Sequence, residues 1–539
     1  MQTGAPASHS REELTMSSLL ERHAEKIAGV LSCYDRVVIY GTLPGLCYAD
    51  GMAAYLGSQG IRLFDYPRWA EPLRDLIRQN AERLAGEAGL KIEFVRKKKV
   101  RKEAIVAEVL AKRGQEPGLV HVLSAMEECE TYQPWHDKKT GRTFLRPDRA
   151  KCLHYYFYFV DPHLGLCYMR VPTWSPFRLQ FYFNGHNQLA AKLRQRGIGF
   201  TLRDNAFLQI DDWQLAQRLS HAMDVARLHR ILDRAARLYC PVLAKLEVSY
   251  HWSIMQAEYA TDVVFKRQTD LAPLYETLVR TAIHAVKPGH VATFLGRRLT
   301  DSYQDELGND FSTRIEGTRI KHYMGAAAAI KMYDKFGLVL RLETTANNVT
   351  FFKHHRKVEQ RDGSSVYKLA PVRKTIYSLD PDLRNLLGDA NRRYLEFLSD
   401  LDDPSAGTKA LQSVSQPATD ANGKTHRGFN FFHRGDEGAL VALLRGEFFI
   451  SGLRHANLRA HLPDTSPAQI SSLLKRLRTH GLLRRIGRTY KVSVYRGTEV
   501  GRWRGKVDRG DLMKCAVDTR CFEARRAGSA RPATAAATG

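Results

Sequence analysis

The sequence predicts an α+β protein of several domains, with a mixed α/β N-terminal region, a mostly helical middle and a small C-terminal module. Three observations predict this fold class. Aromatic and β-branched runs, broken by turn residues over 151–187, are typical of antiparallel strands. Helical patterns dominate 212–290. A capped helix followed by a basic hairpin stands near the end of the chain.

The length of 539 residues predicts about three domains of typical size. Polar, small, Pro- and Gly-containing sequence over 401–426 is typical of a linker, and the last residues are of low complexity. No internal repeat is visible. The expected organisation is a disordered segment over 1–15, a mixed α/β domain over 16–211, a helical domain with a β-hairpin over 212–400, a linker over 401–426, a compact module over 427–500 and a basic, largely disordered tail over 501–539.

Local patterns place the elements of the two large domains. Apolar residues at helical spacing predict helices over 50–58, 68–88, 102–114, 187–196 and 380–400. Runs rich in Val, Ile and aromatic residues predict strands over 34–41, 91–100 and 119–128, and three antiparallel strands over 151–187. A turn at Asp334-Lys335-Phe336-Gly337 predicts a hairpin over 328–345.

The chain is strongly basic. It holds 82 Lys and Arg against 57 Asp and Glu, which is a formal net charge of +25. A surplus of this size attracts polyanions and raises encounter rates with them. No apolar run is long enough to span a bilayer, and the N-terminus lacks the apolar core of a secretory signal, so no membrane partner is expected. DNA or RNA is the expected partner, and a basic surface without such a role is the alternative.

The eight cysteines are scattered along the chain and form no C-x-x-C pair. This spacing argues against a structural zinc site. A chain of this length needs no disulfide framework, so we expect reduced, mostly buried thiols in a cytoplasmic protein.

The C-terminal module carries the clearest local signals. Short apolar helices are expected over 438–444 and 457–462. Ser466 suits the N-cap of a third helix, and Gln469 completes a capping box three residues later. A basic hairpin is expected to follow over 482–494.

The order helix, helix, capped helix and basic hairpin resembles winged-helix domains, including those of the MarR-like regulators. The resemblance covers 427–500 and implies that the third helix enters the major groove, while the wing contacts the backbone or the minor groove. The contacts it implies come from Gln469, Ser471, Ser472, Lys475 and Arg476 on the helix and from Arg484, Arg485 and Arg488 on the wing. A winged helix used for protein contacts or dimerisation is the alternative.

A group of acidic, basic and aromatic residues surrounds the expected hairpin in the middle of the chain. Tyr333, Asp334 and Lys335 precede Arg341 and Glu343. This order resembles the core of rolling-circle replication initiators of plasmids and filamentous phages, which implies acidic ligands for a divalent metal beside a nucleophilic tyrosine. The sequence lacks the His-hydrophobic-His motif found in the common version of that chemistry.

The residue types around the hairpin suit the same chemistry. Arg341 and Glu343 share a strand face, and Glu258 and Asp262 lie four apart on an expected helix. Carboxylates hold Mg²⁺ or Mn²⁺, and a tyrosine can attack phosphorus. The candidate metal ligands are Asp334, Glu343, Glu258 and Asp262, and the candidate catalytic residues are Tyr333, Asp334, Lys335, Arg341 and Glu343. An ordinary hairpin turn beside a solvated helix face is the alternative.

Asp35 and the basic run near residue 100 are further candidates. Asp35 begins an apolar strand, a position at which RNase H-like nucleases carry metal ligands. No second acid follows it in a diagnostic pattern, so a structural cap or salt bridge is the favoured interpretation. The basic run is either a backbone-binding patch or a solvated face; its candidate contacts are Lys97, Lys98, Lys99 and Arg101.

Two further features have both a structural and a functional interpretation. Tyr156 and Tyr158 lie on the strand face opposite Tyr155 and Phe157, and core packing is favoured over base stacking for both sets. His186 follows a strand in a polar turn, and a turn residue is the favoured interpretation.

Taken whole, the chain resembles large basic proteins of bacterial genomes, and three functions fit the sequence. The first is a nucleic-acid-binding protein, for DNA or structured RNA, that serves a mobile or replicating genetic element. The second is a metal-dependent nuclease, nickase or transposase of the same setting. The third is a winged-helix transcriptional regulator whose front half binds a ligand or partner.

Overall fold

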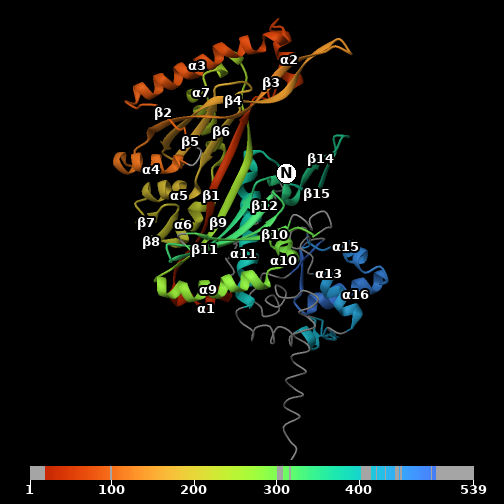
Figure 1. Ribbon diagram of the computed structural model, residues 1–539. Helices are drawn as coiled ribbons and strands as arrows, with labels where there is room; N and C mark the ends of the chain where they lie inside the picture. The colour runs from red at the N-terminus through yellow and green to blue at the C-terminus, as the bar shows by residue number, and fades with distance from the viewer. Residues whose placement is uncertain are drawn as a thin grey trace, which may run out of the picture. The chain divides into compact units, whose positions relative to one another are not determined.

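A computed structural model describes most of the chain (Figure 1). The described residues are 18–96, 100–299, 307–314, 317–401, 414–420, 422–430, 433–443, 448, 452–486 and 489–492. They fall into two compact units. The sheet unit consists of 27–272 and 306–391, and the C-terminal unit collects 1–26, 273–305 and 392–539 so far as these are described.

The sheet unit is built on one eleven-stranded sheet. Two long antiparallel strands, β1 (Ile27–Thr42) and β9 (His251–Phe265), pair at its centre and are labelled in Figure 1. The strand order is β10-β11-β12-β13-β9-β1-β6-β5-β4-β3-β2. The other strands are β2 (Glu93–Phe94), β3 (Gly118–Asp137), β4 (Arg142–Asp161), β5 (Gly165–Pro172), β6 (Leu179–Phe183), β10 (Leu307–Arg314), β11 (Gly317–Met324), β12 (Ala328–Lys335) and β13 (Val339–Ala346).

The two halves of this sheet repeat one order of elements. β1 is followed by helices and by the meander β3 to β6, whose last strand returns to pair with β1. β9 is followed by α9 (Gln268–Ala285), α10 (Pro288–Phe294) and the meander β10 to β13, whose last strand returns to pair with β9. The repeat is one of topology, and sequence reasoning missed it because strand pairing requires a pattern of apolar residues rather than particular ones.

Helices cover both faces of the sheet. One face, here called the α5 face, contacts α4 (Lys102–Arg113), α5 (Gly185–Arg194) and α6 (Trp213–His221). On the other face, α7 (Val225–Tyr239) places the Tyr239 ring 4.5 Å from that of Phe157. The sheet unit also contains α2 (Ala49–Ser58), α3 (Tyr66–Glu87), α8 (Leu243–Leu246) and the hairpins β7 (Phe200–Arg203) with β8 (Ala206–Ile210) and β14 (Lys353–Glu359) with β15 (Ser365–Pro371).

The mixed α/β class agrees with the prediction, but the expected boundary near residue 211 does not divide the sheet. The middle of the chain is also not mostly helical as expected, because it contributes strands β9 to β15. Strand β9 and the meander β10 to β13 belong to the same sheet as the N-terminal strands. The expected helix around Glu258 is strand β9. Its sequence contains good helix formers such as Met255, Gln256 and Ala257. Long pairing with β1 and β13 outweighs that weak local preference.

The predicted hairpin over 328–345 is confirmed as β12 and β13. Phe336 and Gly337 in its turn have φ angles of 58° and 68°. Successive left-handed residues match the right-handed twist of the two strands, which is why glycine is favoured there. Helix α11 (Arg384–Leu401) agrees with the helix expected over 380–400.

The C-terminal unit contains the predicted order of short helices and a hairpin. These are α13 (Arg434–Leu443), α15 (His455–His461), α16 (Pro467–Thr479), β18 (Leu483–Ile486) and β19 (Thr489–Val492). Ser466 caps α16: its hydroxyl accepts from the Gln469 N–H at 3.3 Å, and the Gln469 side chain accepts from the Ser466 N–H at 2.8 Å. Helix α1 (Ser18–Arg22) is also assigned to this unit.

Part of the expected linker over 401–426 is folded. Val414 and Phe429 are buried in one apolar core with residues of α13 and α16. Strands β16 (Ala418–Thr419) and β17 (Thr425–His426) pair between them. A Cβ on Gly428 would lie 1.8 Å from the Ser415 carbonyl oxygen, so this close approach requires glycine. The disorder expected over 1–15 and 501–539 falls outside the described residues, as does 402–413.

Replacing Ser466 by alanine is expected to destabilise α16 by about 1 kcal/mol, because the first-turn N–H groups lose their side-chain acceptor. Hydrogen exchange of the amides at the start of α16 should then accelerate about five-fold. Ser472→Ala is the matched control, since Ser472 is exposed within the same helix. Equal exchange in the two variants would contradict a stabilising cap.

Candidate metal centre

Three carboxylates from three different strands meet on the α5 face. They belong to Asp35 on β1, Glu258 on β9 and Glu343 on β13, and one oxygen of each lies within 4.8 Å of the others. Their side chains are 8%, 15% and 2% exposed, respectively. Three acidic groups so close and so well buried repel one another unless cations balance them.

The register of the sheet explains why these side chains converge. Thr345 pairs with Glu258, which places Glu343 two residues along the same face of β13. Between Tyr34 and Arg36 the pairing of β1 with β9 shifts register, so Asp35 is the extra residue of a β-bulge. Bulges re-aim side chains and recur beside active sites. Here the bulge accompanies a turn of Asp35 toward the two glutamates.

Lys331 and Tyr333 of β12 complete one side of the cluster. The Lys331 ammonium donates to Glu258 at 3.1 Å and also to Glu343, so it bridges two of the three carboxylates. The Tyr333 hydroxyl donates to the other Glu343 oxygen at 2.6 Å. Burial, reinforced by the negative charge of Glu343, raises the pKa of Tyr333 well above its usual value, so this phenol keeps its proton at neutral pH.

Arg341 completes the other side. Its side chain is fully buried and forms a bidentate pair with Asp262, at 2.6 and 2.7 Å. Its remaining terminal nitrogen lies 3.5 Å from Asp35 and makes no hydrogen bond. The His186 ring of α5 lies between the two aspartates, 3.2 Å from Asp35 and 3.5 Å from Asp262.

The pKa values follow from burial and from these charges. Burial raises the pKa of Asp35, but Arg341 and His186 outweigh it and hold that pKa far below the usual range. Burial opposes ionisation of Asp262 in the same way, and Arg341 holds its pKa low. The pKa of Glu258 is raised, first by burial and then by the charge of Glu343. Glu258 is therefore the acid of the triad that most needs a cation.

The donor set fits a hard divalent cation. Mg²⁺ and Mn²⁺ prefer oxygen ligands and are commonly held by a few carboxylates together with water. The bridging ammonium of Lys331 already marks a position of negative potential between Glu258 and Glu343. Asp35, Glu258 and Glu343 would hold such an ion, and Lys331 would supply positive charge close to it.

The structure brings together most of the predicted central residues. Tyr333, Arg341, Glu343 and Glu258 lie in one network, and Lys335 joins it by donating to Asp204 and Asn205 of the β7–β8 turn. Asp262, predicted as a metal ligand, is instead paired with Arg341.

The prediction that Asp334 is a metal ligand and catalytic residue is wrong. It alternates with Tyr333 and Lys335 along β12, so its side chain points to the opposite face of the sheet. A Cβ built on Gly317 of β11 would lie 2.6 Å from its carboxylate, which also places it away from the triad. Asp334 therefore cannot share a metal ion with Glu343.

Asp35 and His186 have a larger role in the site than the sequence predicts. The sequence favours a cap or salt bridge for Asp35 because no second acid follows it in a diagnostic pattern. Its partners lie on strands far along the chain, so no local spacing shows the triad. His186, interpreted as a turn residue, is buried on α5 between two aspartates. The Tyr-Asp step inside an apolar strand is the one local signal that was available.

The predicted nucleic-acid contacts separate into exposed and buried groups. The prediction that Arg476 contacts nucleic acid is wrong, because the side chain is buried, with 8% exposed. It pairs with Asp436 at 2.7 Å and lies 3.8 Å over the Phe429 ring, so it stabilises the core. Gln469 is exposed and serves the cap. Exposed residues are Ser471, Ser472, Lys475, Arg484, Arg485 and Arg101, whereas Lys97, Lys98, Lys99 and Arg488 lie outside the described residues.

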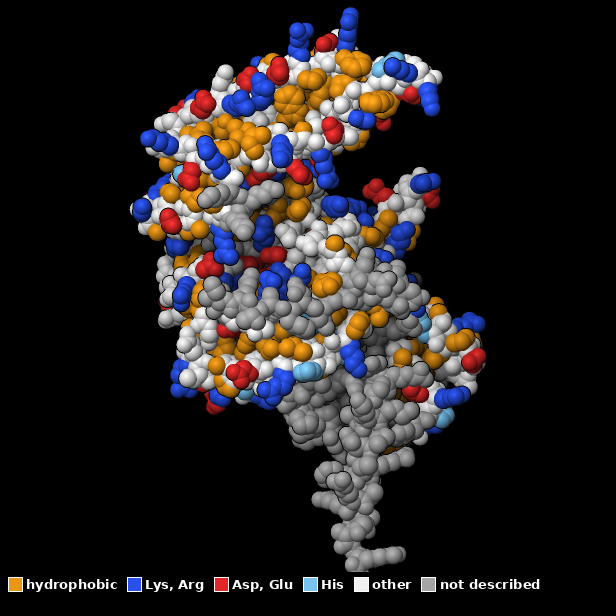
Figure 2. Space-filling model, viewed as in Figure 1, with side chains coloured by type: hydrophobic (Ala, Val, Ile, Leu, Met, Phe, Trp, Pro, Cys, Tyr) orange, Lys and Arg blue, Asp and Glu red, His pale blue; other side chains and the backbone are white. Residues whose placement is uncertain are grey.

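Two exposed basic ribbons also belong to the sheet unit. Beyond its pairing with β5, the β3–β4 hairpin continues as a two-stranded ribbon with exposed Trp135 and Phe144 side by side. Figure 2 shows Lys and Arg side chains at its free end and on the β14–β15 hairpin. The exposed cations of the first ribbon are Lys138, Lys139, Arg142, Arg146, Arg149 and Lys151.

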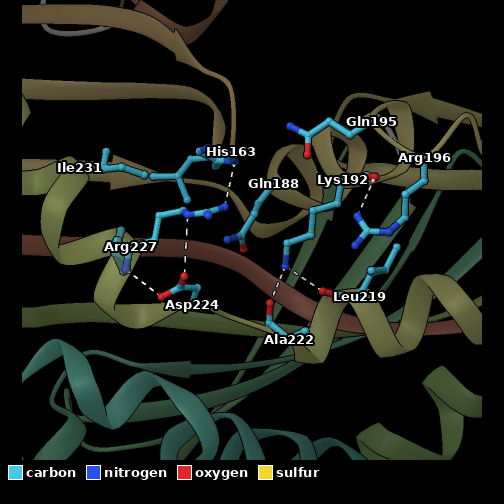
Figure 3. Close-up of a pocket in the computed structure, with 12 residues that line it drawn as sticks. His163, Gln188, Lys192, Gln195, Arg196, Leu219, Ala222, Asp224, Arg227 and Ile231 are labelled. Carbon is cyan, nitrogen blue, oxygen red and sulfur yellow. Dashed lines mark hydrogen bonds and ion pairs between the residues drawn. The ribbon is translucent and has the colours of Figure 1, made fainter.

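A small cavity of about 230 Å³ lies between α5, α6 and α7 (Figure 3). Its cations are engaged within the protein. Lys192 donates to the carbonyls of Leu219 and Ala222 at 2.8 and 2.7 Å, and Arg227 lies 3.7 Å from Asp224. Burial lowers the pKa of Lys192 to about 8. The cavity is best explained as a gap in the packing of the three helices, with no ligand-binding role.

Comparisons with models of known protein families, with curated proteins and with solved structures gave no significant match. Among the helices of the described residues, none has the length and apolar composition that a bilayer crossing requires.

Proposed function

We propose that this protein binds nucleic acid and cleaves phosphodiester bonds with a divalent cation held by Asp35, Glu258 and Glu343. The observation that carries the proposal is the convergence of three buried carboxylates from three strands. Divalent cations in such sites lower the pKa of bound water and stabilise charge on a phosphoryl oxygen. The protein's part is to hold the ion, orient the phosphate and supply positive charge from Lys331.

A water nucleophile suits the site better than a tyrosine nucleophile. Tyr333 is held protonated by burial and by its bond to Glu343, and it therefore acts to orient that carboxylate. This weighs against the covalent step implied by the resemblance to replication initiators. Because Glu258 has a raised pKa, protons compete with the cation there, and activity is expected to fall as the medium becomes acidic.

Nucleic acid is the proposed substrate because phosphodiesters match the charge of the chain. The net charge is +25, and exposed cations lie near the exposed Trp135 and Phe144 on the β3–β4 ribbon, where Arg146 lies 4.2 Å over the Trp135 ring. We also propose that the C-terminal module is a winged helix. Exposed Ser471 and Arg484 support a groove-binding role for it, whereas Lys475, also exposed, pairs with Asp420 at 2.9 Å. The alternative function of a transcriptional regulator does not account for the three buried carboxylates.

The proposal is tested with the purified full-length protein and end-labelled single-stranded DNA, duplex DNA and RNA. Cleavage of at least one substrate is expected with Mg²⁺ or Mn²⁺ and none with EDTA. Binding in EDTA should weaken steeply with salt, because phosphate contacts release counterions. Absence of both cleavage and Mn²⁺ binding would refute the proposed nuclease activity. Binding that does not depend on salt would refute the proposed contacts with nucleic-acid phosphates.

A further inference from the structure

A large cavity opens on the α5 face beside the triad. Its volume is about 1000 Å³, at the upper end of the range of about 300–1,000 Å³ for ligand pockets. It lies between α4, α5 and the β7–β8 hairpin, over strands β4, β5 and β6. The cavity therefore lies wholly within the sheet unit.

Tyrosine rings line the floor of this cavity. Tyr158 and Tyr182 are both among its lining residues, and Tyr168 lies between them with ring centroids 5.2 and 5.0 Å away. The Tyr158 hydroxyl is buried and has no hydrogen-bond partner. Tyr158 and Tyr168 are buried in the core beneath the cavity, whereas Tyr182 is only partly buried and offers the tyrosine ring that a ligand can reach.

Two asparagines join the cavity to the metal centre. Asn184 and Asn205 line the cavity, and both side-chain amides donate to the same oxygen of Asp35, at 3.2 and 2.5 Å. These two amides thus link the lining of the cavity directly to Asp35 of the triad.

We propose that the cavity receives the base of an unpaired nucleotide whose phosphate lies at the triad. This inference rests on the proposed function and specifies its substrate as single-stranded or locally opened nucleic acid. Aromatic platforms accept any base because every base has a π-face. A base within a duplex is stacked on both sides and cannot enter a pocket without leaving the helix.

The wall formed by α4 allows a test that spares the core. Ala107 is exposed on this helix and lines the cavity, whereas Ala104 is exposed on the same helix and does not line it. Ala107→Trp should narrow the cavity beside α4, and Ala104→Trp is the matched control. Tyr182→Leu removes a ring from the floor, and Tyr182→Phe keeps the ring.

The measurement uses the full-length protein in EDTA, so that no catalysis is required. A single-stranded tetranucleotide carrying 2-aminopurine should lose fluorescence on binding, as its base stacks on tyrosine. Wild type, Ala104→Trp and Tyr182→Phe should quench alike, and Ala107→Trp and Tyr182→Leu should bind at least ten-fold more weakly. Equal affinity of Ala107→Trp and the control would contradict the proposal that the cavity binds a base. Equal quenching of 2-aminopurine in a duplex would contradict it as well.

The two proposals fail in different ways. If the tetranucleotide binds in the cavity but no substrate is ever cleaved, the proposed catalysis fails and the base pocket stands. If Mg²⁺-dependent cleavage occurs and Ala107→Trp cleaves single strands as fast as Ala104→Trp, the pocket fails and the catalysis stands.

Discussion

Replacement of Arg341 by methionine is expected to destabilise the sheet unit by about 3–5 kcal/mol, because it removes one partner from a buried ion pair. Arg341 is fully buried and holds Asp262 with two hydrogen bonds. Without the guanidinium, the Asp262 and Asp35 carboxylates stay buried with only the His186 ring between them. Denaturant unfolding, followed by hydrogen exchange of β9 and β13 to locate the effect, measures the loss.

Two further measurements identify the cause of this destabilisation. Asp262→Asn in the Arg341→Met background should restore part of the stability, because it removes one of the unbalanced charges. Arg149→Met changes an exposed arginine and should leave stability within about 0.5 kcal/mol. A destabilisation that Asp262→Asn does not relieve would show that packing, and not charge, is responsible.

The same pair predicts a pH dependence with a definite sign. The folded-state pKa values of Asp35 and Asp262 are lowered, so their contribution to stability is present above the ordinary carboxyl pKa of about 4 and is lost as pH falls below it. In Arg341→Met the same carboxylates are buried without their cation and gain stability on protonation. The difference between the two proteins should therefore shrink in acid.

Replacement of Glu343 by glutamine is expected to reduce metal-dependent cleavage by at least about 100-fold. Changes to residues that merely support a metal ligand cost about 10–100-fold, and Glu343 is a proposed ligand. The variant keeps the shape of the side chain and an oxygen for Tyr333, so the hairpin β12–β13 should remain intact. Cleavage rates and Mn²⁺ affinity, measured together, separate loss of the ion from loss of the fold.

Glu359→Gln is the control for this change, since Glu359 is an exposed glutamate of β14. It should cleave and bind Mn²⁺ as the wild type does. Cleavage by Glu343→Gln at the wild-type rate would show that the triad is a structural ion-pair network. In that case Lys331, which bridges Glu258 and Glu343, has only a structural role.

Much of the local structure was predictable because its causes lie within a few residues. The capping box of Ser466 and Gln469 needs only their spacing, and it forms as expected. The hairpin β12–β13 needs two apolar runs and a turn that tolerates left-handed backbone at Gly337. Alternation along these strands also placed Arg341 and Glu343 on one face, where the structure has them.

Most of the predictions that were wrong depend on contacts between residues far apart in the sequence. Helix propensity differs by well under 1 kcal/mol among ordinary residues, so it could not show that Glu258 belongs to a strand. Asp334 and Glu343 were grouped by sequence proximity, although alternation along β12 turns Asp334 to the other face. The sequence predicts an exposed Arg476 because it lies off the apolar stripe of its helix, but its partner Asp436 lies on another helix and holds it in the core.

The sequence by itself determined the strongly basic character of the chain, the capped third helix of the C-terminal unit and the hairpin that carries Arg341 and Glu343. Each of these depends on composition or on contacts between close neighbours. Only the tertiary structure decided that Asp35 joins Glu258 and Glu343. That convergence depends on the pairing of β1 with β9 and of β9 with β13, and on one bulge, and strand register between distant segments is set by the packing of the whole sheet.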